Sequence, residues 1–169
     1  EYDDAESARW LAAGIDAEVA AILALPSDAA KVRAEAAEMR VLIEEEKPPR
    51  DLWDIKLTPG GLIDLEFIAQ VATLTGQLEG EGRTANTAET LARLAPAFAD
   101  GSTRQELVQA WSLYLVLTQI IRLCLDSPFD RKDVPPGLAD LLLAATDLPD
   151  FSVLEAHLKE MAGEVRTIF

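Results

Sequence analysis

Lys56-Leu-Thr-Pro-Gly-Gly-Leu-Ile-Asp-Leu-Glu-Phe-Ile-Ala-Gln70 places a lysine and two glycines directly before an apolar run that carries two carboxylates. A helix turns about 100° per residue, so apolar side chains between residues 61 and 78 cover more than half of its circumference. A helix of this kind is expected to be largely buried. Glu66 and Gln70 fall on its remaining polar side, and Asp64 lies apart from them, near the helix start.

The rest of the chain also favours helices, because Ala, Leu and Glu dominate and the alternation typical of strands is missing. Capping residues, prolines and glycines predict helices at residues 4–25, 28–46, 61–78, 87–98, 103–125, 136–146 and 152–168. We therefore expect an all-α bundle of about six to seven helices. It should form a single helical domain over residues 1–169, with leading helices over 1–46, a connecting segment over 47–61, and the motif helix with the remaining bundle over 61–169.

Periodicity also predicts which side chains form the core. The helix over residues 28–46 is expected to turn its apolar side chains inward, and the other two segments carry an apolar side and apolar anchors. The inward residues are Val32, Met39, Leu42 and Ile43, those near one side of the first helix are Trp10, Ile15, Val19 and Ile22, and the anchors are Leu52, Trp53 and Ile55. Cys124 stands between two leucines and is expected to be a buried structural thiol. Tyr114, on the apolar helix 103–125, needs a hydrogen-bond partner if it is buried.

Composition limits the classes of function. The 169 residues carry 15 Lys and Arg against 30 Asp and Glu, a formal charge of −15, so the chain as a whole repels polyanions. We expect no nucleic-acid partner and no membrane partner, since uninterrupted apolar runs fall far short of about 20 residues. A cytoplasmic location follows as an expectation. With one cysteine and one histidine, the chain lacks the ligands of a zinc site and the base of most hydrolase triads.

The first segment quoted above is also the candidate site. Lys56 can reach a phosphate or pair with Asp64, and Gly60 and Gly61 let the backbone turn so that free amide groups at the helix start can receive an anion. Glu66 and Gln70 are expected to face a nucleotide or a neighbouring domain. The structural alternatives are that the glycines only shape a turn, that Lys56 only neutralises Asp64, and that Glu66 faces water.

The stretch from Trp53 to Gln70 resembles the helical-domain signature of the glutamine synthetase adenylyltransferase family, and so do residues 31–40 and the Glu-Lys-Pro-Pro sequence ending at Pro49. The resemblance is close over residues 28–75 and looser elsewhere. Ile63-Asp64 is typical of the adenylylating half, because the de-adenylylating half tends to have Arg-Glu there. The PII uridylyltransferase family has a similar helical region, usually with arginine where Ile63 stands, and is the weaker match.

The resemblance implies a bifunctional enzyme with two polymerase-β-type nucleotidyltransferase domains, each followed by a helical domain. Its halves remove and attach AMP at a tyrosine of glutamine synthetase, as directed by PII signal protein and glutamine. This family places its metal-binding carboxylates in an Asp-x-Asp after a Gly-Ser turn, which the present sequence lacks. We therefore expect the catalytic domain upstream, no catalytic or metal-binding residue in this chain, ATP and Mg²⁺ only in the full-length enzyme, and an isolated chain that is inactive and binds neither strongly.

The partners implied by the resemblance are the upstream nucleotidyltransferase domain, glutamine synthetase and a PII signal protein. One alternative is a pure interaction module, which would need an exposed apolar or acidic surface away from the motif. Another is a metal-dependent hydrolase. It ranks last, because Asp64 and Glu66 point about 160° apart on a helix and cannot easily share one ion.

Overall fold

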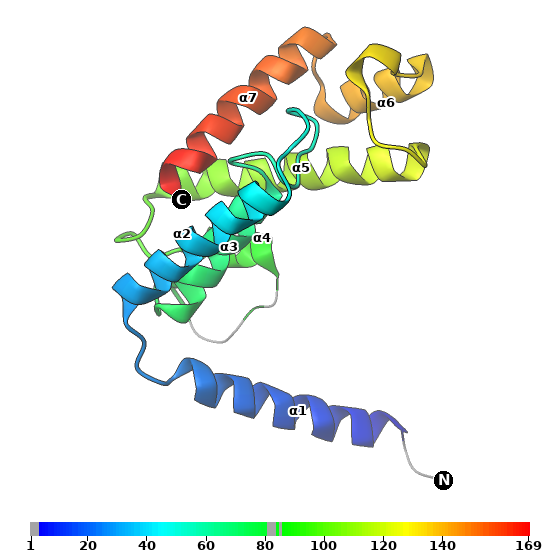
Figure 1. The fold of residues 1–169 in the computed structure, drawn as a ribbon. Coiled ribbons are helices and arrows are strands. Elements are labelled where there is room, and N and C mark those ends of the chain that lie inside the picture. Colours follow the sequence, from blue (N-terminus) through cyan, green and yellow to red (C-terminus); the bar gives the residue numbers. More distant parts are fainter. Residues whose placement is uncertain (1–3, 81–83, 85) are drawn as a thin grey trace.

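The computed structural model describes residues 4–80, 84 and 86–169. Within these residues the chain forms seven α-helices, one short 3₁₀ helix and no named strand, which confirms the predicted all-α fold (Figure 1). The elements are α1 (Asp4–Leu23), α2 (Ala29–Glu46), α3 (Leu62–Leu74), α4 (Thr87–Ala92), α5 (Gly101–Cys124), η1 (Arg131–Asp133), α6 (Pro136–Thr146) and α7 (Phe151–Ile168).

Helix starts follow the predicted capping chemistry. The side chains of Asp28, Asn86, Asp100 and Asp150 each accept a hydrogen bond from a backbone amide in the first turn of their helix. Helix α6 has the predicted bounds, with Pro136 at its start and a left-handed Asp147 at its end. Local sequence signals therefore account for most helix boundaries.

Two predicted helices are shorter in the structure. Helix α3 stops at Leu74, not at residue 78, because Gly76 adopts a φ of 66° and the Gln77 amide donates to the Ala72 carbonyl. The chain then forms an isolated antiparallel bridge between Leu78 and Leu94. This bridge also explains why α4 ends at Ala92 and does not continue to residue 98.

Helix α5 is the centre of the bundle. It contacts α3, α4, α6 and α7, and it runs between the α6–α7 layer and the α3–α4 layer (Figure 1). Its buried side chains are Leu107, Ala110, Tyr114 and Leu117. Length and composition alone would let α5 cross a membrane. Packing by four other helices accounts for its apolar composition in this fold.

The connecting segment anchors the bundle with aromatic contacts. Trp53 and Ile55 are buried as predicted, while Leu52 is half-buried. The Trp53 ring lies 4.5 Å from that of Phe129 and 5.5 Å from that of Phe151. Its indole nitrogen donates to Glu155 Oε1 at 2.9 Å. The segment before α3 is therefore fixed against α7 and the loop after α5.

The leading helices are much more exposed than predicted. Figure 1 shows α1 standing away from the bundle, and Trp10 keeps 79% of its surface exposed. The inward orientation predicted for Met39 and Leu42 is wrong, since both are exposed, whereas Val32 and Ile43 are half-buried. On the apolar side of α1, Ile15 and Ile22 are exposed and Val19 is half-buried. The apolar stripe of α1 exists, but no other described element packs on it.

Two predictions about helix α5 also have a clear outcome. Cys124 is exposed, so the predicted burial of this thiol is wrong. The reason is its place on the last turn of α5, where Leu123 is exposed as well. Tyr114 is buried, and its hydroxyl has no hydrogen-bond partner. Burial, together with the charges of Asp64 and Glu164, raises the pKa of Tyr114 well above its usual value.

Candidate functional site

Asp64 lies in a buried ionic network that joins three helices. Its side chain and that of Arg40 on α2 are fully buried, and the Arg40 Nε donates to Asp64 Oδ1. Arg166 on α7 donates to Asp64 Oδ2 at 3.0 Å. Glu44 completes the group, with its Oε1 2.9 Å from Arg166 Nη2 and 3.1 Å from Arg40 Nη1. Opposite charges therefore hold α2, α3 and α7 together.

The network also fixes the turn before α3. Arg40 Nη2 donates to the Leu57 carbonyl at 2.9 Å, and the Gly60 amide donates to Asp64 Oδ2 at 2.7 Å. The Gly61 amide donates to the Thr58 carbonyl, and the Leu62 amide donates to that of Ile55. The amides of Gly60, Gly61 and Leu62 are therefore used by the chain itself, so the expectation that the two glycines offer free amides to a phosphate is wrong.

Close backbone packing explains both glycines. A Cβ on Gly60 would lie 1.8 Å from the Ala162 carbonyl oxygen, and one on Gly61 would lie 2.1 Å from the carbonyl oxygen of Ile55. Gly60 also has a φ of 80°, which favours glycine. The glycines thus bring the turn against α7, and this structural role was one of the alternatives considered for them.

Lys56 does not take the predicted place beside Asp64. Its side chain is exposed, whereas Asp64 is buried and paired with Arg40 and Arg166. An exposed lysine at this position has no fixed partner among the described residues. The prediction that Lys56 neutralises Asp64 is therefore wrong, and a contact between Lys56 and a phosphate stays a prediction.

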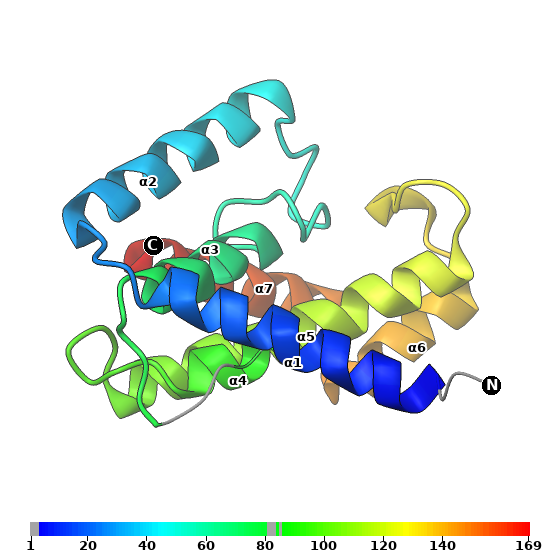
Figure 2. The same ribbon diagram turned by 90° about the horizontal axis from the view of Figure 1, so that it is seen from below.

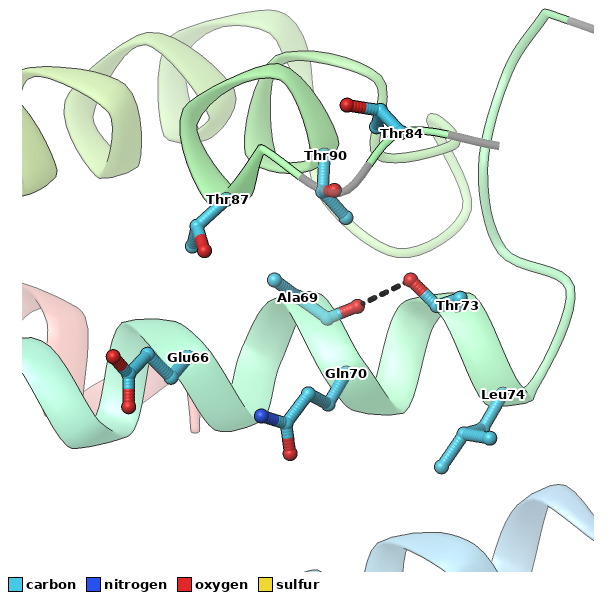
Figure 3. A pocket seen from close by; sticks show the side chains of 8 residues that line it. All are labelled: Glu66, Ala69, Gln70, Thr73, Leu74, Thr84, Thr87 and Thr90. Carbon is cyan, nitrogen blue, oxygen red and sulfur yellow. Dashed lines mark hydrogen bonds between the residues drawn. The ribbon is translucent and has the colours of Figure 1, made fainter. Parts of the chain in front are cut away.

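Glu66 and Gln70 lie on the other side of α3, as the 100° step predicts, and line a pocket of about 330 Å³ between α3 and α4. Figure 3 shows Thr87 and Thr90 facing Ala69 and Thr73 across this pocket. The full lining is Glu66, Ala69, Gln70, Thr73, Leu74, Thr84, Thr87 and Thr90. The separation of Asp64 from Glu66 is thus confirmed, and only Glu66 and Gln70 of the six predicted site residues share a cavity.

Hydroxyl groups give this pocket its chemical character. Thr73 Oγ1 donates to the Ala69 carbonyl at 2.8 Å, and Thr90 Oγ1 donates to the Asn86 carbonyl at 3.0 Å. Thr84 Oγ1 donates to Glu89 Oε2 at 2.7 Å. Each of these hydroxyls has one hydrogen, which is already used, so what it can offer a ligand is an oxygen lone pair.

Sequence reasoning missed several of these residues. Arg40 and Arg166 are 24 and 102 residues from Asp64, and no local pattern links them. The helical periodicity placed Thr73 on the same polar side as Glu66 and Gln70, whereas Thr87 and Thr90 lie on α4 and were not connected with the site. A charged residue in an otherwise buried helix was the one available signal, because a buried carboxylate needs a cation. Within the described residues, no group of three His, Cys, Asp or Glu side chains could hold a metal ion.

The fold defines an all-helical domain. Its central apolar helix, α5, is packed against shorter helices, and a charged cluster lies at the start of α3. The chain belongs to the family described as GlnD PII-uridylyltransferase, whose family model matches residues 37–168. No solved structure gives a significant match.

Curated relatives have a different name from the family model. A bifunctional glutamine synthetase adenylyltransferase/adenylyl-removing enzyme of Mesorhizobium japonicum is 67% identical over 159 residues, which cover 94% of this chain and 16% of the relative. Enzymes of the same name from Brucella suis and Rhizobium meliloti are 46% and 42% identical, over 93% and 89% of the chain. The chain spans 16% of the length of each. These names confirm the resemblance found in residues 53–70.

Proposed function

We propose that this chain is the helical part of the adenylylating half of a bifunctional glutamine synthetase adenylyltransferase. The observation that carries the proposal is the 67% identity over 94% of the chain with an enzyme of that name. The intact protein would transfer AMP from ATP to a tyrosine of glutamine synthetase in the cytoplasm. PII signal protein would regulate it, and the charge of −15 argues against a nucleic-acid partner.

The residues present do not fit Mg²⁺ or the triphosphate of ATP. The described residues that line the pocket at Glu66 include one carboxylate and no lysine or arginine, whereas a nucleotide phosphate needs cations or free amides. The amides before α3 are used within the turn. We therefore assign the ATP and Mg²⁺ sites to the nucleotidyltransferase domain, and we favour docking against that domain as the role of the α3 surface.

The proposal can be tested by measuring the transfer of labelled AMP from ATP, or of labelled UMP from UTP, to an acceptor protein. The chain alone, and the chain joined to its nucleotidyltransferase domain, are incubated with glutamine synthetase or PII protein. We expect AMP transfer to glutamine synthetase by the joined protein only. AMP transfer by the chain alone would overturn the proposal, and UMP transfer to PII by the joined protein would establish the uridylyltransferase alternative.

Glu66→Ala in the joined protein tests the role of the α3 surface. Reduced association of the two domains, measured by calorimetry on separated domains, is the expected result for docking. Lost AMP transfer with unchanged association would instead show that Glu66 acts at the reacting nucleotide.

One observation favours a second candidate function, a protein-interaction module. The apolar stripe of α1, formed by Trp10, Leu11, Ile15 and Ile22, is exposed and lies away from α3 (Figures 1 and 2). Exposed apolar patches of this kind mark binding surfaces. Trp10→Glu should then weaken binding to glutamine synthetase or PII protein without changing AMP transfer to a saturating substrate. Unchanged binding would exclude α1 from that role.

A further inference from the structure

The pocket between α3 and α4 has an unpaired negative charge. Glu66 is half-buried at its edge and has no hydrogen bond or ion pair with any described residue. It is also the one charged residue among the described residues that line the pocket. A carboxylate in such a place attracts a cation, and a partly enclosed site screens that attraction less than open solvent does.

We propose that this pocket binds a cationic hydrogen-bond donor, an alkyl ammonium or guanidinium group, with Glu66 as its counter-ion. The hydroxyls of Thr73, Thr84 and Thr90 support this choice, because their hydrogens are used within the protein and their oxygens can only accept. The hydroxyl oxygens of Thr73 and Thr90 and the two carboxylate oxygens of Glu66 therefore offer four acceptors to a ligand that must supply hydrogens, whereas Thr84 Oγ1 already accepts from the Asn86 amide at 3.0 Å.

The pocket also suits the uncharged part of such a ligand. Ala69 and Leu74 supply apolar surface against which a short methylene chain can lie (Figure 3). A volume of about 330 Å³ is at the small end of ligand sites, which range over roughly 300–1,000 Å³. The same features disfavour phosphate, which would meet the Glu66 carboxylate and no cation from the described lining residues. The inference does not depend on the proposed enzymatic function.

The test is a titration of the 169-residue chain followed by amide NMR shifts. Agmatine and butylamine serve as free amines, a capped Gly-Arg-Gly peptide presents the same group as a protein side chain, and inorganic phosphate is the contrasting anion. We expect saturable shifts at Gln70, Thr73 and Thr87 with the amines. Binding of the capped peptide as well would indicate a protein side chain as the natural ligand, and binding of the amines alone would indicate a small molecule.

Glu66→Gln keeps the shape of the side chain and removes its charge, so it should weaken amine binding at least about tenfold, because a charge-assisted hydrogen bond is lost. Glu45→Gln on the exposed side of α2 is the matched control and should leave binding unchanged. Thr73→Val should weaken it to a smaller degree. No saturable shift with any amine, shifts with phosphate instead, or equal binding by wild type and Glu66→Gln would each overturn the proposal.

Discussion

Arg40 is a residue on which the attachment of a whole helix depends. It is the one fully buried side chain of α2, and it donates to Asp64 and to the Leu57 carbonyl. Arg40→Met should lower the free energy of unfolding by about 3 kcal/mol, because it leaves a buried carboxylate short of a partner. Urea denaturation measures this loss.

Lys31→Met is the matched control for Arg40→Met. It also removes a cation from α2, but Lys31 and Glu35 are 70% and 63% exposed and lie 3.8 Å apart. An exposed pair of this kind contributes roughly 0–1 kcal/mol. The double variant Arg40→Met with Asp64→Leu should recover part of the stability. Equal small losses for Arg40→Met and Lys31→Met would contradict the importance of the buried network.

For these residues the sequence predicted the side of the helix on which each side chain lies, but it did not predict the side chains that contact it. The 100° step placed Asp64 and Glu66 on different sides of α3, and the structure agrees. The partners of Asp64 could not be predicted, because they come from α2 and from α7, whose approach is set by packing of the whole bundle. Lys56 was the nearest cation in sequence, but the turn before α3 leaves it in solvent.

Helix α3 depends on the two glycines that precede it. Gly60→Ala and Gly61→Ala should each destabilise the fold by several kcal/mol, on the order of a severe core clash, since a Cβ would overlap the Ala162 or Ile55 carbonyl oxygen. Gly76→Ala is the control, because Gly76 also has a positive φ, but no atom lies near its added Cβ. Its cost should be roughly 1–2 kcal/mol. Thermal unfolding compares the three variants. A cost for Gly60→Ala equal to that of Gly76→Ala would show that the positive φ alone requires glycine at Gly60, and a small cost for Gly61→Ala, whose φ is −86°, would contradict the predicted clash there.

Helix α5 starts with a pH-sensitive cap. The backbone hydrogen bond from Thr103 lowers the pKa of Asp100 below its usual value, aided by the Thr103 side chain. Because the folded-state pKa is the lower one, the contribution of this carboxylate is present above the unfolded pKa and is lost as the pH falls through the folded pKa. Asp100→Asn should therefore show a smaller loss of stability than wild type between about pH 5 and about pH 2.

Urea denaturation at several pH values measures the Asp100 effect. Asp126→Asn is its control, since Asp126 is exposed and makes no hydrogen bond with a described residue. That variant should follow the wild-type pH dependence. If the free energy of unfolding of Asp100→Asn fell with pH in parallel with that of the wild type, this would show that the cap does not titrate in the acid range.

Helix bounds were predictable where the chain carries its own stop signal. Proline, a capping aspartate or a left-handed residue marks both ends of α6 and the starts of α2, α5 and α7. The end of α4 was not predictable, because it is set by the bridge between Leu78 and Leu94, which joins the segment after α3 to the segment after α4. Local propensity carries no information about such a pairing.

The whole molecule divides into an arm, which is formed by α1, and a bundle, which is formed by the other helices. Deleting residues 1–24 should change the free energy of unfolding of the remainder by less than about 1 kcal/mol, because α1 buries none of its described side chains in the bundle. The same deletion should reduce binding of a hydrophobic dye, since Trp10 and Leu11 are lost. Urea denaturation and dye fluorescence test both points. A large loss of stability would mean that α1 packs on the bundle in solution.

This arm also shows what periodicity can and cannot predict for the molecule. Periodicity placed the apolar residues of α1 near one side of the helix, as most amphipathic helices have it, but it does not predict whether that side covers a core. Whether a partner surface exists for that face depends on the rest of the protein. The chain covers 16% of its relatives' length, so its sequence describes the face and not its partner.

The attachment of α2 by an arginine has a further consequence for how the protein opens. Helices that bury many apolar side chains exchange their amide hydrogens mainly when the whole domain unfolds. Helix α2 buries no apolar side chain completely, and it packs mainly on α3 (Figure 2). Breaking this ionic cluster should then release α2 together with α1. We expect the two leading helices to open as a separate cooperative unit whose amides exchange with solvent while those of α5 stay protected, and hydrogen exchange followed residue by residue measures this.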